Sequence, residues 1–436
     1  MAASSFPIPG MATSPLHRRL QQWTKNATPY GTDAGPRSRK SHWSQPYIVH
    51  VLRSLGLLSS SRLRILHVYK TYLPDNCTGV PRVIYEIAEQ LQGSGVDTQV
   101  LCLSDAPGDR PILTGSHITH QAKQDLFIAS TGLSVSVFSR FNALIRNVDL
   151  VHYHFPWPLA DLLHLTATRK VPTIVTYHSD VVKQRVLGWL YKPLQQRFLN
   201  SVDRIVATSP QYASSSVTLR QFANKTKVIP IGIADRELPY DSVIGSWRDR
   251  VGEDFFLFVG ALRYYKGLPF LVEAARMSGL PVVVVGGGEN RLTDVPPNVV
   301  FVGAVSDEDK EALLSLSRAL VLPSHLRSEA FGIALIEAAR AGKPMISCEI
   351  GTGTTFVNIH GETGLVAPPA HPAALAEAMR RLAAAPETAF QMGEKARRRY
   401  EQLFTARDMA QAYKALYEDV VGGFPGLADG SASSNT

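Results

Sequence analysis

Short apolar segments alternate with amphipathic segments along the chain from Arg62 onward. In the first such pair, residues 65–69 form a continuous apolar run, and apolar residues in 80–91 recur at the i, i+3, i+4 and i+7 spacing of a helix. Gly93 and Gly95 follow and favour the end of that helix. Continuous apolar runs are typical of parallel strands covered on both faces. The pattern therefore predicts an α/β fold with open parallel sheets.

The predicted strands form two series. The first contains residues 65–69, 98–103, 148–153, 173–177, 204–207 and 228–231. The second contains residues 255–259, 282–285, 299–302, 320–322, 345–347 and 365–366. A chain of 436 residues exceeds what one hydrophobic core usually organises. We therefore predict two Rossmann-like domains that face each other across a cleft, where ligands bind at the carboxyl ends of the strands.

Changes in composition and periodicity define the predicted boundaries. They are a flexible extension over 1–61, a first domain over 62–232, a hinge over 233–252, a second domain over 253–405, a helix over 406–421 that could cross back to the first domain, and a disordered tail over 422–436.

Charge and cysteine content narrow the classes of partner. The net charge is +8, but seven basic residues against one acid lie in residues 1–60, so the body is nearly neutral and a nucleic-acid partner is not expected. The extension is either an arm attracted to anionic lipid or the product of a start codon placed too early. No apolar run reaches the length of a membrane span, and no secretion signal is recognised. Three widely spaced cysteines predict free thiols, and we expect a cytoplasmic protein.

Two glutamates stand out in the segment RSEAFGIALIEAARAGKPMIS. Glu337 falls in the middle of an apolar helix, where an unpaired carboxylate is expensive. Either it accepts hydrogen bonds from a ligand diol such as a ribose, or it is solvated or held in a buried ion pair. Glu329 precedes the same helix, whose N-terminus suits a diphosphate, although acidic residues are also common there for their effect on the helix dipole.

Two cations follow a buried strand in FFLFVGALRYYKGLPFLVEA. Arg263 and Lys266 lie on the loop after Gly260 and could neutralise a diphosphate leaving group. The alternative is a pair of surface cations, but a helix N-terminus disfavours them. The run VVVVGGGEN places Gly286, Gly287 and Gly288 after another strand, where the absence of side chains lets the protein backbone approach a ligand closely. A dinucleotide fingerprint is not found there.

Further candidate residues lie in the first domain. Gly79 lies at the start of the first helix and either lets a ligand approach or simply forms a turn. His178 ends the strand PTIVTYHSD and either hydrogen-bonds a sugar hydroxyl or the departing phosphate, or is a structural histidine. Asp180 after it could cap the next helix. That helix, VVKQRVLGWLYKPLQQRFLN, has basic and aromatic residues typical of an interfacial helix, although an ordinary surface helix fits equally. Another strand end supplies possible acceptor contacts from His152, His154 and Trp157.

Together these segments resemble the retaining family-4 glycosyltransferases of the GT-B fold over about residues 62–421. The resemblance implies that Glu329 contacts the donor sugar, Glu337 the ribose, and Arg263 and Lys266 the diphosphate. It further implies a sugar contact for His178 and donor contacts for Gly79, Gly287, Phe331, Gly332 and Ile333. Most relatives carry arginine directly after the strand-ending glycine, where this chain has Ala261.

The run GKPMISCEIGTGTTFVNIHGETGLVAPP, with LRYYKGL, is most similar to bacterial GDP-mannose-dependent α-mannosyltransferases of O-antigen and capsule synthesis. This implies transfer of mannose to a polyprenyl-linked glycan by front-face displacement, without a metal or other cofactor, at the inner face of the plasma membrane. GDP-D-rhamnose and UDP-sugar donors are alternatives. A sugar-nucleotide epimerase of the same fold, a hydride-transfer enzyme and a noncatalytic sugar-binding protein are the competing classes.

Overall fold

The computed structural model describes residues 62–128, 131–180, 185–288 and 292–424. Its first domain is built on an eight-stranded sheet in the order β10-β9-β8-β7-β1-β2-β4-β3, which is parallel except for the β3–β4 pair. The strands are β1 (Leu63–Val68), β2 (Val96–Ser104), β3 (Ile112–Thr114), β4 (His117–Lys123), β7 (Leu150–Phe155), β8 (Thr173–Tyr177), β9 (Arg204–Ala207) and β10 (Thr226–Val228).

The second domain is built on a six-stranded parallel sheet in the order β13-β12-β11-β14-β15-β16. Its strands are β11 (Phe256–Val259), β12 (Val282–Val285), β13 (Val299–Gly303), β14 (Ala319–Leu322), β15 (Met345–Cys348) and β16 (Gly364–Ala367). Two Rossmann-like parallel-sheet domains therefore confirm the predicted fold class.

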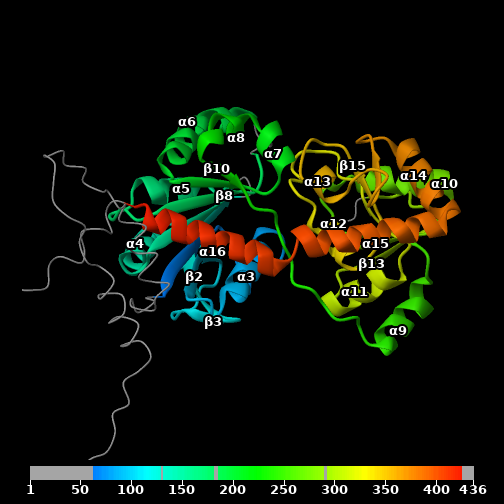
Figure 1. The fold of residues 1–436 in the computed structure, drawn as a ribbon, viewed down its shortest axis with the longest axis horizontal. Coiled ribbons are helices and arrows are strands. Elements are labelled where there is room, and N and C mark those ends of the chain that lie inside the picture. Colours follow the sequence, from blue (N-terminus) through cyan, green and yellow to red (C-terminus); the bar gives the residue numbers. More distant parts are fainter. Residues whose placement is uncertain (1–61, 129–130, 181–184, 289–291, 425–436) are drawn as a thin grey trace, which may run out of the picture. The chain divides into compact units, whose positions relative to one another are not determined.

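Helices accompany both sheets (Figure 1). The first domain has α3 (Val80–Leu91), α4 (Ser136–Leu144), α5 (Pro158–Leu165), α6 (Arg185–Ser201), α7 (Pro210–Ser215) and α8 (Val217–Gln221). The second has α9 (Asp241–Val251), α10 (Leu268–Ser278), α11 (Asp307–Leu316), α12 (Ile333–Arg340), α13 (Thr354–Val357), α14 (Pro372–Ala384) and α15 (Pro386–Leu403).

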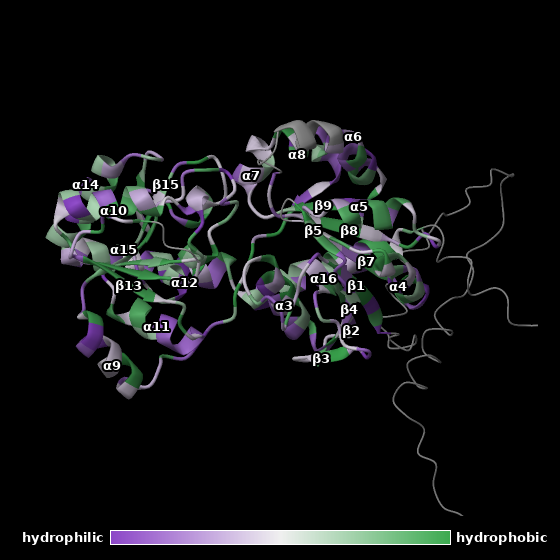
Figure 2. Ribbon diagram, turned by 180° about the vertical axis from the view of Figure 1, so that it is seen from behind, coloured by the Kyte–Doolittle hydropathy of each residue, from purple (hydrophilic) through white to green (hydrophobic). Residues whose placement is uncertain are grey.

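The central strands are buried along their whole length because both faces of each sheet are covered. All residues of β7, β8, β11, β12 and β14 are buried, and Figure 2 shows hydrophobic colour concentrated in the strands. Burying a side chain such as Leu257 or Val284, both at most 1% exposed, stabilises the fold by roughly 1.5–3 kcal/mol. The continuous apolar runs in the sequence thus reflect two-sided burial.

The last helix, α16 (Ala406–Gly422), packs against α3 of the first domain (Figure 1). Two of its tyrosines lie fully buried beneath the first sheet: the Tyr417 hydroxyl bonds to His152 Nδ1 at 2.9 Å, and the Tyr413 hydroxyl to Thr176 Oγ1 at 2.8 Å. Residues from the end of the chain therefore complete the core around β7 and β8.

Several predicted elements differ from the observed ones. The segment over 233–252, expected to be an irregular hinge, contains helix α9, which buries Trp247. The strand expected over 228–231 is found as β10, Thr226–Val228. Strand β4 was not predicted because its polar residues interrupt the apolar pattern of HITHQAK. The hairpin of β5 (Leu126–Ile128) and β6 (Thr131–Leu133) was also not predicted.

The expectations for residues 1–61 fall outside the described residues, as do those for the tail beyond Phe424. Within the described ranges, no helix has both the length and the apolar content that a membrane span requires.

Candidate functional site

The carboxyl end of β11 carries the first part of the candidate site. After Val259 the chain passes through Gly260 and a short 3₁₀ turn, Tyr264–Lys266, before α10 begins. Lys266 Nζ lies 2.5 Å from Glu329 Oε2, and the two side chains are only 12% and 10% exposed. The structure therefore brings together two residues that the sequence placed in different segments.

The surroundings favour the charged form of Lys266 and hold Glu329 in place. Burial alone would lower the pKa of Lys266, but the charge of Glu329 and the hydrogen bond to it outweigh burial, and the pKa is raised. Ser324 Oγ donates a second hydrogen bond to Glu329 at 3.1 Å. Gly260 has φ 154°, which favours glycine, and the lysine chain passes within van der Waals distance of it, with Lys266 Cε 3.4 Å from where a Cβ would stand. A preorganised cation with a compensating acid suits binding of an anionic ligand.

Arg263 is placed differently from Lys266. Its side chain is exposed, and no salt bridge to it is found in the part of the chain that the structure describes. It remains on the same loop as Lys266, with its N–H donated to Ala261 O at 2.8 Å. The two predicted cations therefore share a loop, but only Lys266 is buried against a carboxylate.

Glu337 lies in the middle of α12 and forms an ion pair with a residue that was not singled out in the sequence. Lys310 Nζ, from α11, lies 2.6 Å from Glu337 Oε1, and each side chain is 15% exposed. Lys310 also lies 3.0 Å from Asp307. Burial opposes the charged form of Lys310, but the Glu337 carboxylate prevails, so the pKa of Lys310 is raised. The structure therefore contains the ion pair that was one of the two interpretations of Glu337.

The two ion pairs are electrostatically linked, because the charge of Glu337 also raises the pKa of Lys266. The two glutamates are close in the chain, since Glu337 lies in helix α12 and Glu329 in the segment just before it. The helix begins at Ile333 after Gly332, which has φ 86° in the left-handed region, and its first N–H groups lack partners within the helix. The preceding Phe331 is 3% exposed and packs into the core. Of these predicted donor contacts, Phe331 is therefore a core residue in this structure.

The glycines after β12 are explained by packing between strands. A Cβ on Gly286 would lie 1.9 Å from the carbonyl oxygen of Gly260, and Gly286 has φ 152°. Gly287 accepts a hydrogen bond from Leu262 N at 3.0 Å, and a Cβ on Gly287 would meet only Ala304, at 3.7 Å. Gly286 thus allows the loops after β11 and β12 to touch, while Gly287 keeps open space around it.

The first-domain candidates lie at the start of α3, on or just after β7, and directly after β8. Gly79 has φ 67° and open space around it, consistent with either reading. His178 is 6% exposed, and its Nε2 lies 3.0 Å from His154 Nδ1. His152, His154 and Trp157 were expected to line the acceptor side, but they are at most 1% exposed. That expectation is wrong, because the three side chains point into the packed core.

Asp180 has several partners. Its Oδ1 accepts hydrogen bonds from the hydroxyls of Tyr177, at 3.0 Å, and Ser216, at 2.8 Å. Its Oδ2 lies 3.3 Å from Arg327, whose Nη1 donates to Gly351 O at 2.6 Å. Asp180 therefore joins the first domain to the segment before α12, a role that the sequence did not indicate.

Two of the surface cavities in the described part of the chain lie away from the candidate site. They have volumes of about 370 Å³, beside Arg62 and residues 93–97, and about 270 Å³, beside residues 235–239. Neither is lined by Lys266, Glu329 or His178. These two cavities are therefore separate from the candidate site.

Comparison with known proteins decides the family. The model of "Glycosyltransferase Family 4" matches residues 78–237, and that of "Glycosyl transferases group 1" matches residues 244–399. The D-rhamnosyltransferase WbpZ of Pseudomonas aeruginosa is 51% identical over 353 residues, which cover 79% of this chain and 93% of that protein. The chain belongs to the family-4 glycosyltransferases.

Two further comparisons agree with this assignment. The O-antigen chain mannosyltransferase C of Escherichia coli is 48% identical to this glycosyltransferase, with 81% of this chain and 98% of that protein covered. A sucrose-phosphate synthase of Thermosynechococcus elongatus has a solved structure that matches with a TM-score of 0.70 at 22% identity, over 83% of this chain and all of that one. The fold is the GT-B fold of glycosyltransferases.

Proposed function

We propose that this glycosyltransferase moves a mannosyl or D-rhamnosyl residue from a GDP-linked donor to a lipid-linked glycan in O-antigen or related surface polysaccharide synthesis. The names of its two relatives at 48–51% identity, a D-rhamnosyltransferase and an O-antigen chain mannosyltransferase, support this class of sugar and acceptor. Among the two sugars, mannose from GDP-mannose is our first choice because the resemblance in the sequence is to mannosyltransferases.

The observation that carries the proposal is the Lys266–Glu329 ion pair at the carboxyl end of β11. Ligands of open α/β sheets bind at this end of the strands. Lys266 would neutralise the diphosphate, whose negative charge grows as the glycosidic bond breaks. Glu329 would then be freed to contact the sugar, while Glu337 would exchange Lys310 for the ribose hydroxyls.

The proposed reaction retains the anomeric configuration. The bond between C1 and the phosphate oxygen breaks, and a bond from C1 to the acceptor oxygen forms on the same face. The proton of the acceptor hydroxyl passes to the departing phosphate. No metal is assigned a part, since Lys266 and Arg263 provide positive charge on one loop.

Nucleotide binding and product analysis test this function. Calorimetry with GDP, UDP, ADP, GDP-mannose and UDP-glucose in the presence of EDTA should show binding only of the GDP species. Lys266→Met should abolish that binding, whereas Lys395→Met, at an exposed position on α15, should leave it intact. NMR of the product should show the donor's anomeric configuration. Preferential binding of UDP would refute the proposed GDP-linked donor, and a product of inverted anomeric configuration would refute the proposed retaining mechanism.

We also propose that the protein contacts the membrane surface, on the cytoplasmic side, through the β5–β6 hairpin. Leu126, Phe127 and Ile128 are 52%, 61% and 51% exposed, an unusual run of three exposed large apolar side chains. Lys123, nearby on β4, is exposed and could face anionic lipid. Of the helix expected to be interfacial, Phe198 is buried and therefore unavailable.

Vesicle sedimentation tests the membrane contact. Phe127→Ser should reduce binding to vesicles that contain phosphatidylglycerol, while Phe390→Ser, at a residue 64% exposed on α15, should not. Equal binding by the two variants would exclude the hairpin as the contact surface.

A further inference from the structure

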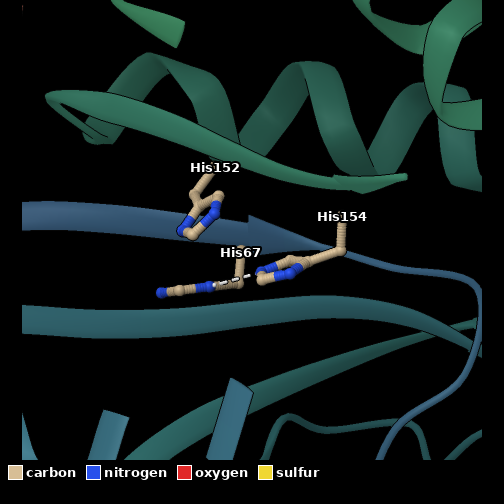
Figure 3. Close-up of side chains that lie close together, drawn as sticks. All are labelled: His67, His152 and His154. Atoms are coloured by element: carbon tan, nitrogen blue, oxygen red, sulfur yellow. Dashed lines mark hydrogen bonds between the residues drawn. The ribbon is translucent and has the colours of Figure 1, made fainter. Parts of the chain in front are cut away.

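Four buried histidines lie on three neighbouring strands of the first sheet. His67 is on β1, His152 and His154 are on β7, and His178 directly follows β8. Their exposed fractions are between 0 and 6%. Figure 3 shows three of these rings close together, with a hydrogen bond from His67 to His154. Each ring brings two polar nitrogens into a core, which is costly unless both are bonded.

Three of the four rings are bonded in series. His67 Nδ1 lies 2.9 Å from His154 Nε2, and His154 Nδ1 lies 3.0 Å from His178 Nε2. The rings are nearly parallel, with interplanar angles of 18° and 21°. Because His154 uses both nitrogens and a neutral imidazole has one N–H, one bond must be donated and the other accepted. The proton positions in the three rings are therefore coupled.

All three imidazoles are neutral near pH 7. Burial lowers the pKa of His67 and of His178 to about 3. Burial, with contributions from the neighbouring histidines, lowers the pKa of His154 well below its ordinary value. Only two arrangements remain: all three protons on Nδ1, or all three on Nε2.

The free end of the series distinguishes the two arrangements. His67 Nε2 is fully buried and has no hydrogen-bond partner. With protons on Nε2, this atom would be an orphaned N–H; with protons on Nδ1, it is a bare lone pair. Orphaned N–H groups are rarer in protein interiors than under-satisfied acceptors. The geometry therefore favours protons on Nδ1 throughout.

We propose that His154, oriented by His67, is a positioning residue that holds His178 in the Nδ1-protonated form. No hydrogen bond to His178 Nδ1 is found in the described ranges. This nitrogen is also not fully buried, so it is the one open to solvent. His178 then acts as a hydrogen-bond donor to an oxygen of the donor sugar or phosphate, not as a base. This assignment rests on the proposed function for the identity of the ligand.

A metal ion held by His67, His152 and His154 is the competing reading, since one nitrogen from each lies within 4.8 Å of the others. Five of the six ring nitrogens, however, already make hydrogen bonds. His152 uses both of its nitrogens, with Thr176 at 2.7 Å and Tyr417 at 2.9 Å. A metal would have to displace these bonds, so the hydrogen-bonded series accounts for the cluster better.

NMR of the full chain with ¹⁵N-labelled histidine tests the proton positions directly, without reference to activity. In the wild type, His178 should show a protonated Nδ1 and a bare Nε2. His154→Asn should preserve this form, because the amide N–H stands near the former Nδ1. His154→Leu should yield a mixture of tautomers at His178. A protonated Nε2 in the wild type overturns the proposal, even if neither variant folds.

Activity and metal content complete the test. His154→Leu should lower kcat about tenfold, in line with the loss of one oriented hydrogen bond, and His154→Asn should restore most of it. Equal kcat in both variants would overturn the positioning role. One equivalent of metal per chain, lost in His154→Leu, would favour the metal site instead. Absence of glycosyl transfer with the expected tautomer would refute the proposed function alone.

Discussion

Acid should destabilise this protein through its buried histidines. The pKa of His67 and of His178 is about 3 in the folded state and near 6.5 in the unfolded state. The unfolded state therefore binds more protons, and stability present above pH 6.5 is lost as the pH falls from 6.5 toward 3. At pH 5.5 each such group costs about 1.4 kcal/mol.

His152 and His154 have a pKa well below 6.5 for the same reason of burial, so their protonation on unfolding adds to this loss in the same direction. His67 and His178 alone remove about 3 kcal/mol of the free energy of unfolding between pH 7.5 and 5.5. That is a large fraction of the roughly 5–15 kcal/mol by which native proteins are stable. The melting temperature should therefore fall steeply over this window.

Proton uptake on unfolding is the most direct assay. Calorimetry at pH 5.5 in buffers of different ionisation enthalpy should show about 0.9 fewer protons bound on unfolding of His154→Asn than of the wild type. His360→Gln, at an exposed histidine, serves as the matched control for a changed side chain. A wild-type melting temperature that does not change between pH 7.5 and 5.5 would refute the assignment of neutral buried rings.

Three further substitutions test packing and pairing. Gly286→Ala should cost about 3 kcal/mol, because its Cβ would meet Gly260 O at 1.9 Å; chemical denaturation measures this. Arg340→Met should cost about 3–5 kcal/mol, since it strips the ion pair from Glu311, which is 10% exposed; the melting temperature reports it. Tyr417→Phe should cost about 1 kcal/mol by removing a buried hydrogen bond, measured in the same way.

Controls separate these effects from general damage. Gly245→Ala, in α9 with open space around it, should stabilise the fold by about 1 kcal/mol. Adding Glu311→Leu to Arg340→Met should recover part of the loss, because no unpaired charge remains. A Gly286→Ala protein as stable as Gly245→Ala would show that the loops can separate without cost.

Much of the fold could be predicted because two-sided burial leaves a clear trace in the sequence. Strands such as β12, with four consecutive valines, can be predicted directly from the sequence. Strand β4 could not, since its side chains alternate between buried and exposed and include His117 and Gln121. Helix α9 was missed because only Trp247 of its eleven residues is buried, so it has almost no apolar stripe.

The sequence identified candidate site residues but not which of them form ion pairs or hydrogen bonds with one another. Lys266 and Glu329 were each identified from their position after a strand or before a helix. That they touch depends on how β11 and β14 pair in the sheet, which no local pattern encodes. Lys310 was missed because a lysine in an acidic first turn looks like a surface residue. His154 was noticed as a strand residue, but its bond to His178 required the register of β7 and β8.

The return of α16 to the first domain bears on how the protein is made. On the ribosome, the strands of the first sheet emerge long before Tyr413 and Tyr417, which fill its core and bond to His152 and Thr176. The core of the nascent first domain therefore lacks these tyrosines, and His152 lacks its Tyr417 partner, until the whole second domain has been synthesised. Premature termination before α16 would leave the first domain without these two tyrosines, so translation must pass Tyr417 before the core around β7 and β8 is complete.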